Sequence, residues 1–222
     1  MPFQGLGKFS ERRLKAPLRF LRISIWETNG RNFVFCYLYI KPAGRGFPPS
    51  LPLYTMKKIL LLSDTHGTLD AAILRHAREA DQIWHAGDIG SMAVAEGLAA
   101  VAPLRAVYGN ADGGEIRAAF PERLRFVEEG VEVLLKHIGG YPGHYDRSVQ
   151  EELFAAPPTL FVCGHSHILK VMMDRRLGVM HFNPGAAGRY GIHHVRTLLR
   201  FTLEKGKIDH LEAIELGPRA GW

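Results

Sequence analysis

The chain has 222 residues, of which 46% are hydrophobic and 23% charged, a composition typical of a globular protein with a buried core. It shows no apolar run of transmembrane length, and its two cysteines, Cys36 and Cys163, are too few for a disulfide framework. We therefore expect one main domain in a reducing compartment, most simply the cytoplasm.

The net charge of +6 is concentrated at the front of the chain. Of the 28 Lys and Arg residues, nine lie in residues 1–55 beside only two acidic residues, so residues 56–222 carry 19 basic and 20 acidic side chains. A nucleic-acid partner is therefore not expected for the main domain. We interpret residues 1–55 as a basic extension, either disordered or a start-site artefact; an arm that contacts RNA or a membrane surface is the alternative.

The extension has one strand-like stretch, Asn32–Ile40, followed by a linker rich in proline and glycine at Lys41–Pro52. The main domain then begins at Met56 with a continuous apolar run that ends at Asp64-Thr65-His66-Gly67, which is typical of a strand buried on both faces. Side chains two apart on an extended chain point the same way, so Asp64 and His66 can face one metal ion. The alternative is that Asp64 caps the next helix and His66 is solvated.

After this strand the pattern alternates between helices and strands. Thr68 is predicted to cap a helix that reaches Arg78, and Ser91 to cap a second helix over Met92–Val101. Strands are predicted at Gln82–His85 and Leu104–Tyr108. Short links between such elements predict a largely parallel sheet, in which ligands gather beyond the carboxyl ends of the strands.

The second half is richer in strands. A helix capped by Asp146 is predicted across Gln150–Phe154. The predicted strands are Arg123–Val127, Glu132–Lys136, Leu160–Cys163, Lys170–Met173, Val179–Phe182, Arg196–Leu203 and Lys207–Ile214, the first two and the last two each joined by a tight turn.

Residues able to bind a metal stand at or just after the ends of these strands: Asp64, His66, Asp88, Asn110, His137, His165 and His167. A single metal site needs three or four protein ligands, so seven candidates suggest two metals that share a carboxylate. A mixed set of histidine, carboxylate and amide ligands suits Mn, Fe, Zn or Ni.

The motifs SDTHG, HAGD, YGNAD, CGHSH and Asn183-Pro184-Gly185 occur in an order that resembles the calcineurin-like metallophosphoesterase superfamily, in particular its small bacterial and archaeal phosphodiesterase branch. The resemblance covers Met56–Leu216 and makes 56–222 a metallophosphoesterase domain. It implies an α/β fold with two facing mixed β-sheets flanked by helices and metals at their top edge. It further implies that Asp64, His66 and His167 bind one metal, that Asn110, His137 and His165 bind the other, and that Asp88 bridges both.

The same resemblance implies a phosphodiesterase that hydrolyses a small-molecule phosphate ester with a metal-bridged hydroxide, and it favours manganese. Asp88 and Asn110 would then belong to the catalytic centre. The alternatives are a nucleotide phosphomonoesterase with the same metals, or a non-catalytic scaffold of this fold, as in the retromer subunit that resembles these proteins. A scaffold should have lost several ligands, and this sequence keeps all seven. No membrane partner is expected, and a homo-oligomer is left open.

Two positions depart from the family pattern. Many phosphatases of the superfamily carry a histidine after the asparagine of the GN motif, thought to protonate the leaving group, where this chain has Ala111. We therefore expect a preference for good leaving groups unless another acid serves; Asp112 is one candidate, and a role in orienting the loop is its alternative. Secondly, the segment after His137 reads IGGYPGH up to His144, and this loop is expected to line the substrate mouth.

Several other residues have secondary interpretations. His85 is expected to support the ligands or pack in the core, and Asn183 to form a turn with the proline and glycine that follow it. His144, Arg147 and Arg189 lie close enough in sequence to the motifs to bind phosphate oxygens. The remaining histidines without ligand-like neighbours are not expected at the site: His181, His193, His194 and His210.

Overall fold

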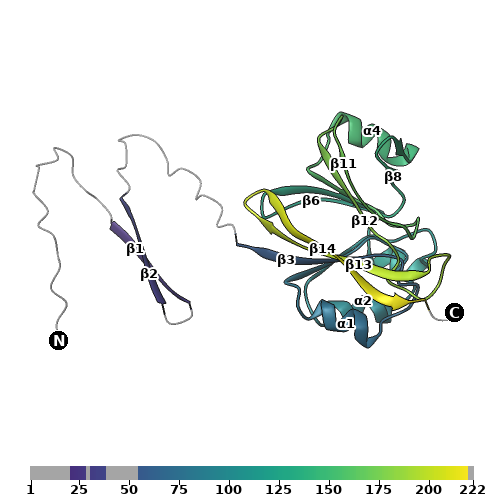
Figure 1. The fold of residues 1–222 in the computed structure, drawn as a ribbon, viewed down its shortest axis with the longest axis horizontal. Helices are drawn as coiled ribbons and strands as arrows, with labels where there is room; N and C mark the ends of the chain where they lie inside the picture. Colours follow the sequence, from purple (N-terminus) through teal and green to yellow (C-terminus); the bar gives the residue numbers. More distant parts are fainter. Residues whose placement is uncertain (1–20, 29–30, 39–54, 220–222) are drawn as a thin grey trace, which may run out of the picture. The chain divides into compact units, whose positions relative to one another are not determined.

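A computed structural model of the protein describes residues 21–28, 31–38 and 55–219. The chain divides into two compact units, Met1–Pro52 and Leu53–Trp222. In the first unit, β1 (Leu21–Thr28) and β2 (Arg31–Leu38) form an antiparallel hairpin (Figure 1). β2 corresponds to the predicted strand at Asn32–Ile40, whereas β1 was not predicted, and the linker predicted at Lys41–Pro52 lies outside the described residues.

The second unit contains two five-stranded mixed sheets. The first has the order β14-β13-β3-β4-β5, with β3, β4 and β5 parallel and β13 and β14 antiparallel to their neighbours. Its strands are β3 (Lys57–Leu62), β4 (Gln82–His85), β5 (Leu104–Ala106), β13 (Val195–Glu204) and β14 (Lys207–Pro218). The parallel centre is the one expected from the alternating pattern.

The second sheet has the order β11-β12-β10-β7-β6, with a parallel centre and antiparallel edges. Its strands are β6 (Arg123–Glu128), β7 (Val131–Lys136), β10 (Leu160–Val162), β11 (Leu169–Asp174) and β12 (Val179–Pro184). A separate short pair is formed by β8 (Gly140–Tyr141) and β9 (His144–Tyr145).

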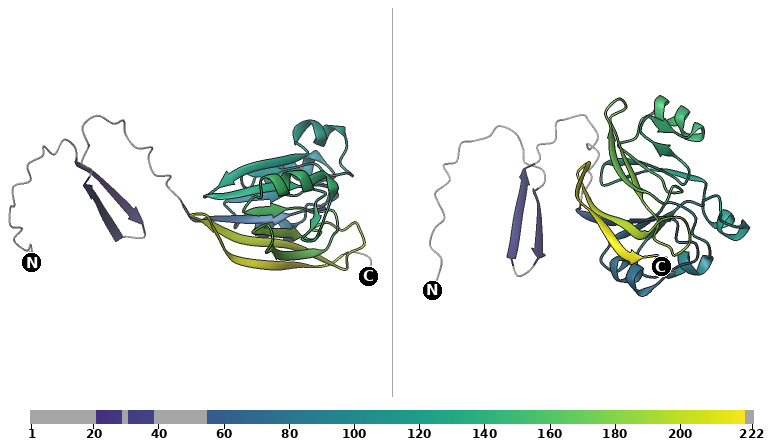
Figure 2. Two further views of the ribbon diagram at one scale, coloured as in Figure 1. Left: turned by 90° about the horizontal axis from the view of Figure 1, so that it is seen from above. Right: turned by 45° about the vertical axis from the view of Figure 1, so that its right-hand side comes forward.

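Helices cover the outer faces of the two sheets, with α1 (Ala71–Ala77) and α2 (Met92–Ala99) on the first and α4 (Arg147–Ala155) on the second (Figures 1 and 2). The alternation along β3 explains how: Leu60 and Leu62 pack toward α1 and α2, whereas Ile59 and Leu61 pack between the sheets. Trp84 lies in the core between the sheets, its ring edge-on to Phe201. The predicted α/β fold of two facing mixed sheets flanked by helices is confirmed.

The helix starts are partly as predicted. Asp146 caps α4, since its side chain accepts a hydrogen bond from the backbone N–H of Ser148 at 2.8 Å. Thr68 does not cap the first helix, which begins at Ala71 with Asp70 as its cap. The reason is that the chain at Thr68 still belongs to a turn, in which the Thr68 N–H donates to the carbonyl of Thr65 at 2.8 Å. The short helix α3 (Gly114–Ala119) was not predicted, because its glycine start carries no capping signal.

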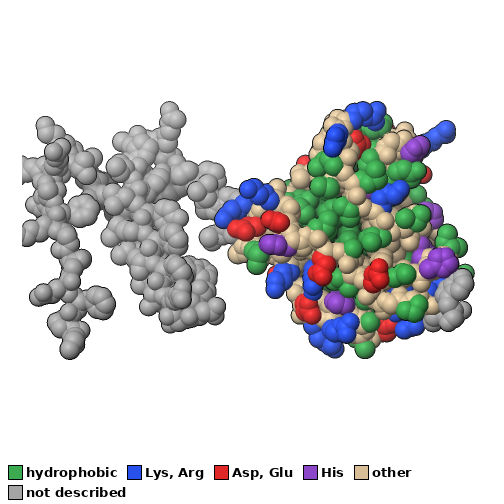
Figure 3. Space-filling model, viewed as in Figure 1, with side chains coloured by type: hydrophobic (Ala, Val, Ile, Leu, Met, Phe, Trp, Pro, Cys, Tyr) green, Lys and Arg blue, Asp and Glu red, His purple; other side chains and the backbone are tan. Residues whose placement is uncertain are grey.

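Strand β11 leaves apolar side chains uncovered at the edge of the second sheet. Leu169, Val171 and Met173 are each more than a third exposed, and hydrophobic side chains gather on the face shown in Figure 3. Val171 pairs with Phe182 of β12, so these side chains extend the inner face of the sheet. Among the helices of the described residues, none combines the length and apolar character that a membrane span requires.

Candidate metal centre

The predicted site residues follow the parallel strands of both sheets. Asp64 and His66 come after β3, Asp88 after β4 and Asn110 after β5 in the first sheet; His137 comes after β7, and His165 and His167 after β10, in the second. Since the carboxyl ends of parallel strands lie at one edge of a sheet, the two sheets bring these segments to a shared edge.

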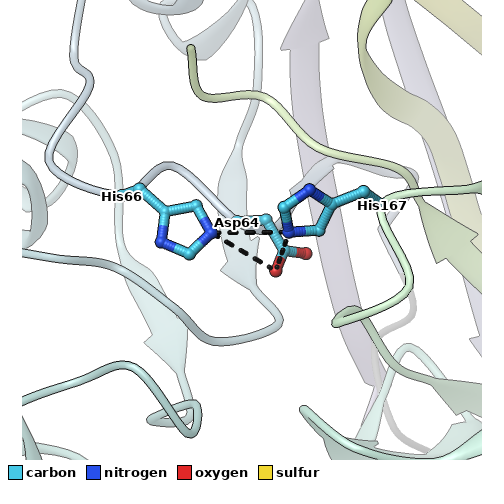
Figure 4. A group of neighbouring side chains, drawn as sticks. All are labelled: Asp64, His66 and His167. Carbon is cyan, nitrogen blue, oxygen red and sulfur yellow. Dashed lines mark hydrogen bonds and ion pairs between the residues drawn. The ribbon is translucent and has the colours of Figure 1, made fainter. Parts of the chain in front are cut away.

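Asp64, His66 and His167 form one compact group (Figure 4). Oδ1 of Asp64 lies 3.2 Å from Nε2 of His167 and 4.0 Å from Nε2 of His66. The two Nε2 atoms of the histidines are 3.4 Å apart. A carboxylate oxygen and two ring nitrogens therefore face a common point.

Asp88, His137 and His165 form a second group. Nε2 of His137 lies 3.3 Å from Oδ2 of Asp88, and the rings of His137 and His165 are 5.3 Å apart. Oδ2 of Asp88 is also 3.9 Å from Nε2 of His66, so Asp88 lies between the two groups. Asn110 lines a cavity together with His137.

The charges of the two groups influence each other. Burial raises the pKa of Asp64, but the closeness of His167 and His137 outweighs it and holds the pKa below its ordinary value. The pKa of Asp88 is lowered in the same way by His137. Burial lowers the pKa of His137, but the carboxylates of Asp88 and Asp64 more than compensate and raise it. The site therefore stabilises two carboxylates by positive charge close to them.

The proton on His137 can be placed from its partners. Nδ1 lies 2.7 Å from the carbonyl oxygen of Ala86, which only accepts, so in the neutral ring Nδ1 carries the proton and Nε2 a lone pair. Nε2 of His137 and Oδ1 of Asp64 are buried without a hydrogen-bond partner among the described residues. A ring nitrogen and carboxylate oxygens that face each other at 3.3–3.9 Å leave a place for positive charge between them, which a proton on His137 or a divalent metal would supply. The donor set of imidazole nitrogens and carboxylate oxygens fits a divalent metal.

His167 is oriented by a histidine that sequence reasoning did not select. Nδ1 of His167 lies 3.3 Å from Nδ1 of His193, whose Nε2 lies 3.1 Å from the carbonyl of Gly188. Since that carbonyl accepts the Nε2 proton of neutral His193, the Nδ1 of His193 accepts the Nδ1 proton of His167. The Nε2 of His167 is then left as a lone pair toward Asp64. No sequence pattern links His193 to His167, because the two are 26 residues apart and the contact is tertiary.

The backbone of the site has an unusual conformation. Eight non-glycine residues of the described chain have positive φ, and five of them are predicted ligands: Asp64 (54°), His66 (45°), Asp88 (53°), His165 (66°) and His167 (57°). Positive φ costs free energy for such residues and is concentrated in proteins at functional sites. The strain is therefore further support for a functional centre at this edge.

Two glycines allow the loops to approach each other closely. A Cβ at Gly109 would overlap the backbone nitrogen and side chain of Asp88, and a Cβ at Gly87, which also has φ +95°, would lie 2.6 Å from Nδ1 of His137. These contacts explain why glycine precedes Asp88 and Asn110.

The supporting residues hold the ligand loops together. Asp112 accepts hydrogen bonds from the backbone N–H groups of Ile89 (3.1 Å), Gly90 (2.8 Å) and Gly109 (2.8 Å). His85 is buried beside the hydroxyl of Thr65 at 2.8 Å, and burial lowers its pKa to about 4, so it is neutral near pH 7. Asn183 is buried near the end of β12, and its Oδ1 accepts from the N–H of Gly185 at 3.0 Å, in keeping with the turn predicted there. Its Nδ2 donates to the carbonyl of Gly164 at 2.8 Å, a contact with a ligand loop that was not predicted.

The residues suggested as phosphate ligands lie in different surroundings. Arg189 pairs with Asp70 at 3.0 Å, and the ring of exposed His144 packs at 5.0 Å from that of Tyr141. The segment after His137 forms the β8–β9 hairpin, and only its first residue, Ile138, lines the cavity. The structure therefore does not bring Tyr141 or His144 to the cavity wall.

The comparisons with known proteins agree with this geometry. The family model of the calcineurin-like phosphoesterase superfamily domain matches residues 56–206. A search of curated proteins gives no match.

Solved structures with a similar fold include an archaeal phosphodiesterase, 21% identical, covering 71% of this chain and 99% of its own, with a TM-score of 0.52. Zinc-bound Vps29 from Entamoeba histolytica is 16% identical; the match covers 72% of this chain and 99% of Vps29, with a TM-score of 0.53. A predicted phosphoesterase from Streptococcus pneumoniae is 16% identical; the match covers 72% of this chain and 98% of that protein, with a TM-score of 0.51. At sequence identities of 16–21%, these matches show that the chain shares the fold of these proteins.

Proposed function

The chain belongs to the calcineurin-like phosphoesterase superfamily, and from this we propose that it is a metal-dependent phosphodiesterase acting on small-molecule phosphate esters. The proposal depends mainly on one observation, the two adjacent Asp and His groups at the shared edge of the sheets. Their buried, unpartnered acceptor atoms would be costly to maintain without a cation.

We assign Asp64, His66 and His167 to one metal, Asn110, His137 and His165 to a second, and Asp88 to both. The 3.3 Å and 3.9 Å separations of Asp88 Oδ2 from His137 and His66 support its place between them. Two divalent metals at such a site would supply Lewis-acid activation of a phosphoryl group and of water.

The chain's own residues would prepare the site for this chemistry. Asp64 and Asp88 stay ionised, because nearby histidines hold their pKa values low. His137 and His167 are held by Ala86 and His193 with Nε2 free to bind a metal. Both carboxylate oxygens of Asp112 accept backbone N–H bonds, which supports an orienting role for Asp112 and makes it a poorer candidate for the acid.

We favour diesters over monoesters for two reasons. Ala111 offers no proton to the leaving group, and one of the similar structures is a phosphodiesterase. Manganese is our preferred metal from the family likeness, and the zinc bound to Vps29 of similar fold makes zinc the first alternative. We further infer a cytoplasmic location and no nucleic-acid partner; a homo-oligomer stays a prediction.

The test compares hydrolysis of bis-p-nitrophenyl phosphate and p-nitrophenyl phosphate by metal-free protein reconstituted with Mn²⁺, Zn²⁺, Fe²⁺ or Ni²⁺. We expect the diester to be preferred, two metals per chain by elemental analysis, and loss of both activity and one metal in Asp88→Asn. Faster cleavage of the monoester would favour the phosphomonoesterase. Failure to bind metal, or metal binding without hydrolysis of either ester, would favour the scaffold, although all seven predicted ligands are present.

A further inference from the structure

A cavity of about 430 Å³ adjoins the metal centre and is bordered by Asn110 and His137. It lies between α3, the end of β7 and the start of α4, and its volume falls within the range of small-molecule sites. An ester whose phosphoryl group faced Asn110 and His137 would have room here for one alcohol substituent.

The positive and negative charges of the Lys, Arg, Asp and Glu side chains on the cavity wall are equal in number. Arg117 and Lys136 supply two positive charges, and Glu122 and Asp146 supply two negative ones. Lys136 pairs with Glu122 at 3.0 Å, and the carboxylate of Asp146 accepts from the N–H and the hydroxyl of Ser148 at 2.8 and 2.6 Å. A wall without net charge gives no advantage to an anionic or cationic substituent.

Two charged side chains of this wall, Arg117 and Asp146, are held in place by hydrogen bonds that leave other polar atoms of each unused. Arg117 donates from Nε to the carbonyl of Asp112 at 2.7 Å and from Nη2 to that of Asn110 at 3.1 Å, while its guanidinium lies 4.8 Å from the centre of the Tyr108 ring. Nη1 of Arg117 takes part in neither bond. Both bonds to Asp146 end on Oδ1, so neither uses Oδ2. A hydroxyl group, which both donates and accepts, matches this arrangement.

We infer that the cavity binds the alcohol substituent of a phosphodiester, and that this alcohol is uncharged and carries further hydroxyl groups, as glycerol or a sugar does. The inference rests on the proposed phosphodiesterase activity. Arg117 and Asp146 are then specificity-determining residues. One contributes a positive and the other a negative charge to the wall, and the protein holds both side chains in place before the substrate binds.

The experiment uses four p-nitrophenyl phosphodiesters that release the same chromophore and differ in the second alcohol: propanol, glycerol, glycolate and choline. For the metal-loaded full chain we expect kcat/KM for the glyceryl ester to exceed that for the propyl ester about tenfold, as one hydrogen bond to a charged group would give. The glycolate and choline esters should not exceed the glyceryl ester.

Asp146→Asn preserves helix capping, since asparagine caps as well as aspartate, but removes one charge and one acceptor from the wall. We expect it to lower the ratio of glyceryl to propyl rates several-fold and to raise the relative rate of the glycolate ester. Glu151→Gln, an exposed change on the same helix outside the cavity, is the matched control and should leave these ratios unchanged.

The outcomes separate the two proposals. If wild type cleaves none of the four esters, the proposed function is wrong and the inference falls with it. If it cleaves all four at similar rates, or prefers a charged one, the function stands and the inference is wrong. Ratios that shift equally in Asp146→Asn and Glu151→Gln would also overturn the role of the cavity.

Discussion

His193 fixes the orientation of His167 through a pair of ring nitrogens 3.3 Å apart. We predict that His193→Ala weakens metal binding 10–100-fold, as loss of a partner behind a ligating histidine commonly does. The reason is that His167 would be free to rotate or to change the nitrogen that carries its proton. Isothermal titration of the metal-free protein with Zn²⁺ or Mn²⁺ measures the effect directly and does not depend on any substrate.

The matched control for this change is His210→Asn, because His210 is exposed on β14 and its φ of 50° is one that asparagine tolerates. It should leave the metal affinity at the wild-type value. Equal affinities for wild type and His193→Ala, with both folded as judged by circular dichroism, would show that His193 only packs beside the site.

Ala111 is an exposed residue whose backbone N–H donates to Oδ1 of Asp88 at 2.8 Å. Without an acid at this position the rate should depend steeply on the leaving group, so aryl diesters should be cleaved far faster than alkyl diesters. We predict that Ala111→His flattens this dependence, with a gain of as much as about 10²–10⁴-fold for poor leaving groups if the imidazole reaches the leaving oxygen.

A series of leaving groups measured on both proteins checks this. Equal slopes, with wild type already fast on alkyl esters, would mean that another residue supplies the proton. The Ala111→Ser variant, which keeps the backbone bond to Asp88 and adds no comparable acid, is the control for a change of size alone.

Single site residues could be predicted from the sequence where their role shows in the residues next to them. Asp64 and His66 could be selected because they follow an apolar run, and the structure brings them together with His167; it does so through a loop with positive φ at Asp64 and His66, beyond the end of β3 at Leu62, and not through the extended chain that we expected. The partition of the other ligands came from resemblance to a family. His193 could not be found, because its role depends on a contact 26 residues away along the chain.

Among the elements, helix α1 depends on Asp70, which caps it and also pairs with two arginines. Asp70 Oδ2 lies 2.9 Å from Arg196, which is only 2% exposed, and 3.0 Å from Arg189. Asp70→Asn should keep the cap but leave Arg196 buried without a countercharge. We predict a loss of about 3 kcal/mol in the free energy of unfolding at pH 7, measured by urea denaturation.

The loss should depend on pH. Burial raises the pKa of Asp70, but the hydrogen bonds and charge of Arg196 outweigh it and place the pKa below its ordinary value. A carboxyl with a lowered folded pKa stabilises the protein above its unfolded pKa, about 3.9, and this contribution disappears as the pH falls through the folded pKa. The difference between wild type and Asp70→Asn should therefore shrink below about pH 4. A constant difference from pH 7 to pH 3, or one equal to that of the exposed control Asp209→Asn, would contradict the ion-pair explanation.

The elements that sequence patterns predicted are those with a strong hydrophobic period. The central strands β3 and β10 are short runs rich in apolar residues, buried over most or all of their length, and their short length favours a strand over a helix. Helix α3 and the β8–β9 pair have no such period, and their glycines favoured loops. The cap predicted at Thr68 was wrong because the turn around Gly67 extends to Thr68, whose N–H donates to the carbonyl of Thr65, and the helix begins only after Asp70.

For the whole molecule, the alternating pattern predicts a parallel sheet but not that a second sheet faces it. The core between the sheets joins Trp84 of β4 with Phe182 of β12 and Phe201 of β13, which come from distant parts of the chain. Periodicity within a window shows that such residues are buried but does not show against what. The two-sheet arrangement was therefore predictable only through the resemblance carried by the motifs.

The division of the chain at Pro52 predicts that the second unit is sufficient by itself. Of the hydrogen bonds that the described residues make near this boundary, a chain starting at Met56 loses the exposed ones of Thr55 to Glu129, at 2.7 and 3.1 Å. Since exposed hydrogen bonds contribute little, we expect its melting temperature to fall by no more than about 2–4 °C. Its metal stoichiometry and its rate on bis-p-nitrophenyl phosphate should match those of the full chain. A chain starting at Leu53 retains Thr55 and is the control; if both shortened chains lose metal binding or precipitate, residues 1–52 are needed by the fold and are more than an extension.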